Sequence, residues 1–286
     1  MLTRTPSELP ACGVVISPSF RPILDTAGLR RLEDFFAAEL PGERLTKPGL
    51  GHRQRWRLTL HDADGSARTV YLKRFVPPPI RQQLRRLLGP GRRCSTGGWE
   101  WTAIHRLAAA GIPTMTPLAV GQEMLGGCWE RRSFVVTDAV GGEALERWLP
   151  VHLAGDLDAR RALRRRLVDA VADLVRRFHA AGFCHRDLYT SHVFVAVEPE
   201  LRLWLIDLQR VFSPRWRRGR WRIKDLAELH FSTPAGCVPA TDRVRFLKRY
   251  LGIDRLDARA KRLARRIAAK ARRIARHDLR RRRRQP

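Results

Sequence analysis

The stretch between residues 185 and 207 constrains the fold more than any other part of the chain, because a polar loop there is followed by two short apolar segments. The loop HRDLYTSH occupies residues 185–192 and follows a helical pattern. The apolar segment VFVAV comes directly after it, and a second apolar segment, LWLID, ends at Asp207. A helix, a loop and two strands in this order place Asp187 in the loop and Asp207 at the end of the second strand.

Two aspartates in this arrangement suit phosphoryl transfer from a nucleotide. That reaction needs a carboxylate at the acceptor hydroxyl and metal ions across the phosphates. Asp187 is the candidate for receiving or orienting the acceptor proton, and Asp207 can reach a magnesium ion that bridges the phosphates. His192 stands five residues after Asp187, where the kinase signature has a metal-binding Asn. We interpret it as the second metal ligand, with a solvated loop histidine as the alternative.

The nucleotide also needs a cation and a covering loop, and both have candidates upstream. Lys73 lies in the strand pattern TVYLKRF, and Glu100 lies on a predicted helix. An acidic partner of this kind holds a lysine on the α and β phosphates. The segment KPGLGHRQRW supplies Gly49 and Gly51 as the loop over the phosphates. Two glycines also suit an ordinary turn, so this assignment is the weakest of the set.

The periodicity of the chain predicts an α+β protein. The expected strands cover residues 53–60, 67–76, 117–121 and 132–138, and the expected helices cover 29–40, 98–110 and 156–181. A sheet-rich first half therefore precedes a helix-rich second half. This layout is that of two lobes, a small β-rich N-lobe and a larger helical C-lobe, and together with the motifs at Asp187 and Asp207 it favours a protein-kinase-like fold.

The chain is expected to divide into four parts. These are an N-terminal extension over residues 1–44, an N-lobe with the Lys/Glu pair over 45–140, a C-lobe with the catalytic and metal-binding loops over 141–253, and a basic amphipathic helix with an Arg-rich tail over 254–286.

The charge balance is strongly basic. Against 28 Asp plus Glu the chain has 56 Lys plus Arg, a formal net charge of +28. Such a charge implies an anionic partner, for which nucleic acid, an acidic membrane surface and a phosphorylated glycolipid are the candidates. Residues 254–286 hold 15 Lys plus Arg and three Asp, with apolar residues at helical spacing. The apolar stripe favours docking on a membrane surface as much as it favours a solvated helix.

Five scattered cysteines form no CxxC pair, and no apolar run is long enough for a secretion signal or a membrane span. We therefore expect a cytoplasmic location with peripheral contact at a membrane.

Several other residues have two interpretations. Asp225 in KDLAEL is either a helix cap or, as in kinase folds, the residue that ties the catalytic loop to the next helix, and we interpret it as structural. His185 is expected to bond backbone near the metal-binding segment. Trp216 and Trp221 lie among arginines and are expected to pack rather than to contact a glycolipid.

At HRDLYTSHVF, IDLQR and WRIKDLAELHFS the chain resembles the lipopolysaccharide kinase family of WaaP-type core heptose kinases, a branch of the kinase-like superfamily. The likeness extends over residues 45–252. Members of the family are similar in four features, which appear here as Lys73 in LKR, Glu100 before AIHRLAAAGIPT, His192 in place of Asn, and Asp207 with Arg210 in IDLQR.

The resemblance implies transfer of the ATP γ-phosphate to a sugar hydroxyl, typically of a heptose in the lipopolysaccharide inner core, at the cytoplasmic face of the inner membrane. It also implies that Asp187 is the catalytic residue, that Asp207 is the metal ligand, and that Lys73 and Glu100 anchor the nucleotide.

Two other functions remain open. A kinase-like protein can act on a different acceptor, a protein or a small metabolite, because fold alone does not fix function. The absence of an APE-like segment after IDLQR argues against a protein acceptor. A nucleic-acid-binding protein without catalysis would explain the charge but not the motifs, so nucleic acid is not the expected partner.

Overall fold

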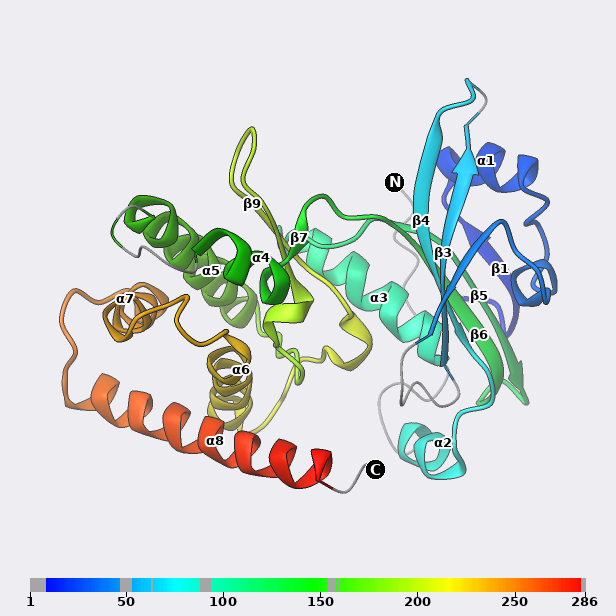
Figure 1. Ribbon diagram of the computed structural model, residues 1–286. Coiled ribbons are helices and arrows are strands. Elements are labelled where there is room, and N and C mark those ends of the chain that lie inside the picture. Colours follow the sequence, from blue (N-terminus) through cyan, green and yellow to red (C-terminus); the bar gives the residue numbers. More distant parts are fainter. Residues whose placement is uncertain are drawn as a thin grey trace. The chain divides into compact units, whose positions relative to one another are not determined.

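A computed structural model describes residues 9–46, 53–62, 64–87, 94–153, 158 and 160–283. Its contacts divide the chain into two compact units (Figure 1). Unit 1 comprises Met1–Ala109 and Met115–Val140, and unit 2 comprises Ala110–Thr114 and Gly141–Pro286. Unit 1 is rich in β-structure and unit 2 is mostly helical, which confirms the predicted α+β class. The finer division into extension, lobes and tail stays a prediction.

Unit 1 is built on a six-stranded antiparallel sheet in the order β1-β5-β6-β4-β3-β2. Its strands are β1 (Cys12–Ile16), β2 (Gly42–Leu45), β3 (Arg53–His61), β4 (Ala67–Phe75), β5 (Pro117–Leu125) and β6 (Trp129–Asp138). All four predicted strands are present, the last two in longer form. Residues of the predicted N-terminal extension, 1–44, form β1 and all but the last residue of β2, the two edge strands of this sheet.

The two faces of this sheet bury different side chains because residues alternate along each strand. One face packs against η2 (Pro18–Phe20), α1 (Arg21–Thr26) and η3 (Asp34–Phe36), and the opposite face packs against α3 (Thr96–Ala109). A short helix, α2 (Ile80–Leu87), follows β4.

Lys73 occupies the face of β4 that α3 covers. Val70 and Leu72 belong to the cluster on the α1 face, whereas Phe75 belongs to the cluster on the α3 face with Trp101. Lys73 alternates with Leu72 and therefore shares the side of Phe75. Close approach of α3 requires Gly97, because a Cβ there would lie 2.7 Å from a backbone oxygen of β6.

The helix predicted over residues 29–40 is wrong, since this segment contains only turns and η3. The carboxylate of Asp34 accepts the backbone N–H groups of Arg30 at 2.8 Å and of Arg31 at 2.6 Å. These bonds offer the backbone an alternative to helical hydrogen bonding. Phe35 is fully buried and stacks on Phe134 with ring centroids 4.0 Å apart.

Unit 2 combines a three-stranded sheet, in the order β7-β8-β9, with five α-helices among the residues described. In chain order its elements are β7 (Glu143–Ala144), α4 (Leu145–Leu153), α5 (Arg161–Ala180), η4 (Thr190–His192), β8 (Val193–Ala196), β9 (Arg202–Leu205), η5 (Leu208–Arg210), α6 (Arg218–Ser232), α7 (Ala240–Leu251) and α8 (Ala258–Arg282). Helix α5 packs against α7, and α6 packs against α8.

Helix α8 confirms the predicted basic C-terminal helix over 25 residues. The carboxylate of Asp257 caps it by accepting the backbone N–H of Ala260 at 2.6 Å. Ala260, Ile267 and Ala271 are buried, so the apolar stripe packs inside unit 2. Within the described ranges, no helix has the length and apolar character needed to cross a membrane.

Candidate active site

A buried carboxylate on α6 fixes the loop between α5 and β8. Asp225 Oδ2 accepts the backbone N–H of His185 at 2.7 Å, and Oδ1 accepts the backbone N–H of Arg186 at 2.9 Å. His179 Nε2 lies 3.2 Å from the same Oδ2. Asp225 lies in the middle of α6 rather than at its start, so the helix-cap interpretation is wrong. The residue instead ties the loop to the helix.

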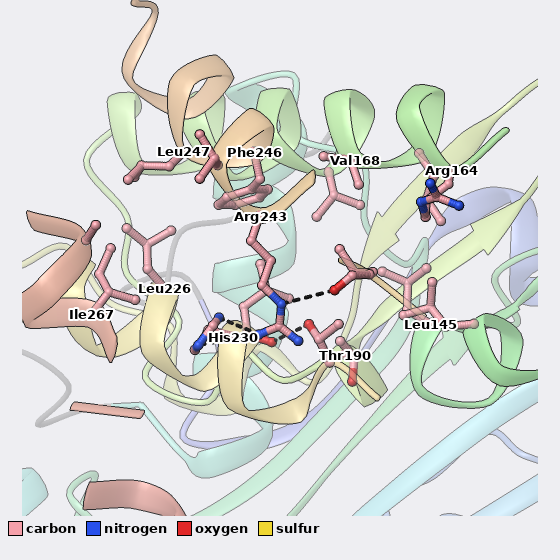
Figure 2. Close-up of a pocket in the computed structure, with 18 of the residues that line it drawn as sticks. Leu145, Arg164, Val168, Thr190, Leu226, His230, Arg243, Phe246, Leu247 and Ile267 are labelled. Atoms are coloured by element: carbon pink, nitrogen blue, oxygen red, sulfur yellow. Dashed lines mark hydrogen bonds between the residues drawn. The ribbon is translucent and has the colours of Figure 1, made fainter. Parts of the chain in front are cut away.

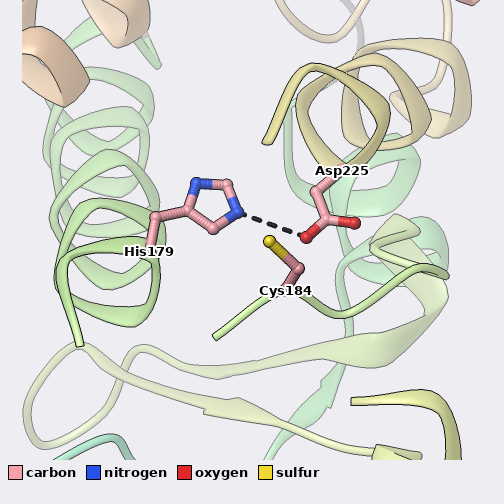
Figure 3. Close-up of side chains that lie close together, drawn as sticks. All are labelled: His179, Cys184 and Asp225. Carbon is pink, nitrogen blue, oxygen red and sulfur yellow. Dashed lines mark hydrogen bonds and ion pairs between the residues drawn. The ribbon is translucent and has the colours of Figure 1, made fainter. Parts of the chain in front are cut away.

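His179, Cys184 and Asp225 place their side-chain heteroatoms within 4.8 Å of one another (Figure 3). Burial raises the pKa of the Cys184 thiol to about 12, so the sulfur stays protonated. The second ring nitrogen of His179 bonds the hydroxyl of Tyr250 at 2.9 Å. Because both oxygens of Asp225 accept backbone hydrogen bonds from the loop and the thiol is protonated, we interpret this cluster as a support for the loop.

His192 connects the two aspartates that the sequence singled out. Its Nδ1 bonds the backbone carbonyl of Asp187 at 2.8 Å, and its Nε2 lies 3.5 Å from Asp207 Oδ2. A carbonyl oxygen only accepts, so Nδ1 carries the hydrogen and the Nε2 of a neutral ring presents its lone pair. The structure thus brings Asp187, His192 and Asp207 together in unit 2.

The backbone at the end of β9 sets the position of Asp207. Asp207 has φ 58° and ψ 60°, in the left-handed region that residues other than glycine seldom adopt. His185 Nε2 donates to the carbonyl of Ile206 at 3.1 Å, which confirms the expected bond to backbone next to the metal-binding segment. Burial lowers the pKa of His185, so this ring is neutral.

The lone pair of His192 and the carboxylate of Asp207 fit two ligands of one divalent cation. Magnesium prefers oxygen ligands, which Asp207 supplies. An imidazole nitrogen is a softer ligand that suits transition metals better. These residues can therefore hold magnesium, with a weaker preference for it than an aspartate and an asparagine would have.

The structure adds three charged residues around the loop that sequence reasoning did not assign to the site. Arg210 Nη1 donates to both carboxylate oxygens of Asp187, at 2.7 and 2.9 Å. Lys224 donates to the carbonyl of Arg186 and to the carboxylate of Glu228. Burial raises the pKa of Glu228 to about 7. Two features of the sequence could have indicated these residues: Arg210 follows Asp207 by three positions, and Lys224 and Glu228 form an i, i+4 pair on a helix.

In unit 1, Lys73 Nζ and Glu100 Oε1 form an ion pair at 2.5 Å. The Glu100 side chain is fully buried and that of Lys73 is 12% exposed. The carboxylate is thus a direct partner for the amino group of this nearly buried lysine. Gly49 and Gly51, the predicted phosphate loop, lie outside the described residues.

The two tryptophans near α6 differ. Trp221 packs against Phe212, with ring centroids 5.1 Å apart, as expected. Trp216 is 82% exposed, so the packing expectation is wrong for it.

Residues 43–250 match the lipopolysaccharide kinase (Kdo/WaaP) family. The lipopolysaccharide core heptose(I) kinase WaaP of Escherichia coli strain K12 is 32% identical over 194 residues, which are 66% of this chain and 72% of that protein. The protein with the same description from Pseudomonas aeruginosa is 36% identical over 157 residues, 53% of this chain and 58% of that one. A solved structure of WaaP in complex with acyl carrier protein matches with a TM-score of 0.63 at 27% identity, covering 92% of this chain and 98% of that chain.

Proposed function

Because the chain belongs to the lipopolysaccharide kinase (Kdo/WaaP) family, we propose that it transfers the γ-phosphoryl group of ATP to a hydroxyl of a heptose in the lipopolysaccharide inner core. The family makes the chain a kinase. The observation that carries the finer proposal is the group formed by Asp187, His192 and Asp207 within one unit. The proposal of a heptose as the acceptor rests on the two relatives described as lipopolysaccharide core heptose(I) kinases.

Each residue of this group has a role in the proposed reaction. Asp187 accepts the proton of the acceptor hydroxyl as its oxygen forms a bond to the γ-phosphorus. The bond from that phosphorus to the β,γ-bridging oxygen breaks at the same time, and its electron pair leaves with ADP. Asp207 and His192 would hold a magnesium ion, which neutralises charge on the phosphates. The Lys73 and Glu100 pair would anchor the α and β phosphates.

Phosphate transfer from ATP to purified core oligosaccharide that lacks the heptose phosphate tests this proposal. Asp187→Asn should lower the rate by about 10²- to 10⁴-fold, the usual contribution of a general base. Asp207→Asn should abolish magnesium-dependent turnover, and Asp254→Asn, an exposed position, serves as the control. Unchanged rates in both site variants would show that the mechanism is wrong.

The same assay separates the alternative functions. Labelled phosphate in peptides or in small metabolites but not in the sugar would indicate another acceptor. Steeply salt-dependent nucleic-acid binding without ATP turnover would indicate a non-catalytic protein.

We also propose peripheral contact with the cytoplasmic face of the membrane that carries the lipid acceptor. Helix α8 carries eight exposed basic residues between residues 259 and 276, namely Arg259, Lys261, Arg262, Arg265, Arg266, Arg272, Arg273 and Arg276. Juxtamembrane basic clusters of this size bind anionic lipids. The buried apolar stripe of α8 makes this contact electrostatic rather than insertive.

An acyl carrier protein is a further partner that we propose, because a pocket in unit 2 suits an acyl chain. The pocket has a volume of about 290 Å³ and lies among α4, α5, α6, α7 and α8 (Figure 2). Leu145, Val168, Leu226, Leu247 and Ile267 are among its apolar lining residues. Its support from relatives is the WaaP structure that contains acyl carrier protein.

The pocket also has a polar side. Arg243 bonds His230 Nδ1 at 2.8 Å and donates to the carbonyl of Val238 at 3.2 Å. Thr190, three residues after Asp187, contributes to the wall. A guanidinium beside an apolar cavity suits a chain with a polar head.

Co-elution of the protein with palmitoyl-acyl carrier protein, compared with the unacylated carrier, tests this partner. Ala268→Trp should fill the pocket and reduce retention of the acylated carrier. Ala269→Trp, on the exposed side of the same helix, should not. Equal retention of both carriers by the wild type would contradict the proposal, and thermal unfolding of each variant shows whether it is folded.

A further inference from the structure

The carboxylate of Asp187 is held by an arginine from a different segment. Arg210 Nη1 lies 2.7 Å from Oδ1 and 2.9 Å from Oδ2. The side chain of Arg210 is 48% exposed and that of Asp187 is 25% exposed. The guanidinium therefore contacts the carboxylate on one side and faces solvent on another. Its Nε and Nη2 have no hydrogen-bond partner among the residues that the structure describes.

Other cations near the loop are engaged elsewhere. The guanidinium of Arg186 lies over the rings of Phe212 and Trp221, at 5.5 and 5.3 Å from their centroids. Lys224 is bound to a backbone carbonyl of the loop and to Glu228. Among the residues of unit 2 that the structure describes, Arg210 is therefore the basic residue that forms hydrogen bonds and an ion pair with the Asp187 carboxylate.

The backbone holds Arg210 firmly on both sides. It ends η5, the single turn that begins after the left-handed residue Asp207. Two residues later, Phe212 exchanges backbone hydrogen bonds with Cys184, at 2.9 and 3.1 Å. Cys184 directly precedes His185 of the loop. Arg210 is thus fixed between the end of β9 and the start of the loop that carries Asp187.

We propose that Arg210 is a catalytic residue, which rests on the proposed kinase function. One guanidinium N–H keeps Asp187 oriented toward the acceptor hydroxyl. The unpartnered N–H groups donate to the phosphoryl oxygens while the acceptor oxygen bonds to the γ-phosphorus, the bridging bond breaks toward ADP and the hydroxyl proton passes to Asp187. Charge spreads over these oxygens in the transition state, so a fixed cation there stabilises it more than the ground state.

A transition-state analogue tests this contact without any sugar acceptor. The affinities of the protein for ADP and magnesium, with and without aluminium fluoride, are measured by calorimetry. The wild type should bind the fluoride complex more tightly than ADP alone. Arg210→Ala should lose about 10²-fold of that preference, the effect of one missing donor, while its affinity for ADP alone stays within a few-fold. Arg215→Ala, an exposed arginine of the same unit, should match the wild type.

Turnover supplies the second readout. Arg210→Ala should lower kcat by about 10³-fold, with the KM for ATP nearly unchanged, and millimolar guanidinium should restore part of the loss. Arg210→Lys should fall between the two because it keeps one charge but not the fork of donors. An Arg210→Ala variant that keeps the full preference for the fluoride complex would overturn the proposal. If the assumed sugar is wrong, turnover is absent in the wild type but fluoride binding still decides the role of Arg210.

Discussion

Glu228 is an unusual group next to the catalytic loop, because its side chain is 3% exposed and carries a carboxyl group with a pKa raised to about 7. Burial is the main cause, and the Lys224 ammonium offsets part of it. The folded state therefore favours the protonated acid. This stabilisation is complete below the unfolded value near 4.5 and is lost as the pH rises toward 7.

Glu228→Gln is expected to remove this pH dependence, since an amide does not ionise. The free energy of unfolding of the variant, relative to the wild type, should rise by on the order of 2 kcal/mol between pH 5 and pH 7, at about 1.4 kcal/mol for each pKa unit. Urea denaturation across that range measures it. Glu146→Gln, exposed on α4, should leave the difference flat. A flat difference for Glu228→Gln as well would mean that its carboxylate stays charged when buried.

His192 predicts a distinctive metal dependence. An imidazole nitrogen together with one carboxylate favours manganese over magnesium more than an all-oxygen set does. Turnover titrated with each ion should therefore reach half-maximum at a lower concentration of manganese than of magnesium. His192→Asn offers an amide oxygen instead, and it should reduce the ratio of the two half-maximal concentrations several-fold. His230→Asn, in the apolar pocket, is the control variant. A ratio that His192→Asn does not change would show that this ring does not contact the ion.

The candidate residues around Asp187 could be predicted from the sequence because they lie close to one another along the chain. His192 lies five residues from Asp187, and Asp207 ends the next hairpin, so strand length alone brings them near each other. The contacts of Arg210 and Asp225 depend on how η5 and α6 return to the loop. No periodic pattern in the sequence predicts these tertiary contacts. For this reason Arg210 was not assigned to the site and the role of Asp225 was ambiguous.

At the scale of elements, α5 and α7 are joined by three ion pairs of different burial. Arg164 and Asp242 are 5% and 6% exposed and pair at 2.6 Å, whereas Arg249 and Asp173 are 53% and 27% exposed. Removing one partner of a buried pair strands a charge and costs about 3–5 kcal/mol, while an exposed pair contributes about 0–1 kcal/mol. Arg164→Met should therefore destabilise unit 2 far more than Arg249→Met in urea denaturation.

A double substitution shows how much of that cost comes from the stranded charge. Arg164→Met with Asp242→Leu should recover most of the lost stability, because neither charge remains buried. If the double variant is as unstable as the single one, packing of the arginine stem rather than its charge holds the two helices together.

Helical periodicity predicted α3, α5 and α8 well and failed at residues 29–40, for physical reasons that differ. Apolar residues at three- and four-residue steps identify a buried face but not its partner. The stripe of α8 was therefore equally compatible with a membrane, and only the structure shows that it packs on α6. In 29–40 the same spacing is present, but the side chain of Asp34 captures the backbone N–H groups that a helix would need.

At the scale of the whole chain, which has a net charge of +28, the basic residues are unevenly paired with acidic ones. In α5 and α7, arginines pair with aspartates. Along the outer face of α8 the described arginines lack such partners apart from Arg282, which pairs with Asp278. Excess charge in one continuous surface attracts an anionic surface far more strongly than the same charge scattered over the molecule. The position of the charge, rather than its total, should therefore decide membrane binding.

Two variants of equal net charge separate position from total. One replaces Arg262, Arg265, Arg266 and Arg273 on α8 by Gln, and the other replaces the exposed arginines Arg21, Arg81, Arg161 and Arg166. Binding to phosphatidylglycerol vesicles, measured by sedimentation, should weaken by on the order of 1 kcal/mol for each arginine removed from α8. The second variant should lose much less binding free energy. Phosphatidylcholine vesicles should bind neither.

Salt distinguishes electrostatic docking from insertion in the same experiment. The Debye length shrinks from about 10 Å at 0.1 M to about 3 Å at 1 M salt, so contact made by exposed arginines should be released across that range. Binding that persists at 1 M salt would require an apolar surface in the bilayer. Such persistence would mean that exposed apolar side chains such as Trp216 and Leu279 enter the bilayer, or that the stripe packed on α6 is released, and the arginine surface would no longer explain the contact.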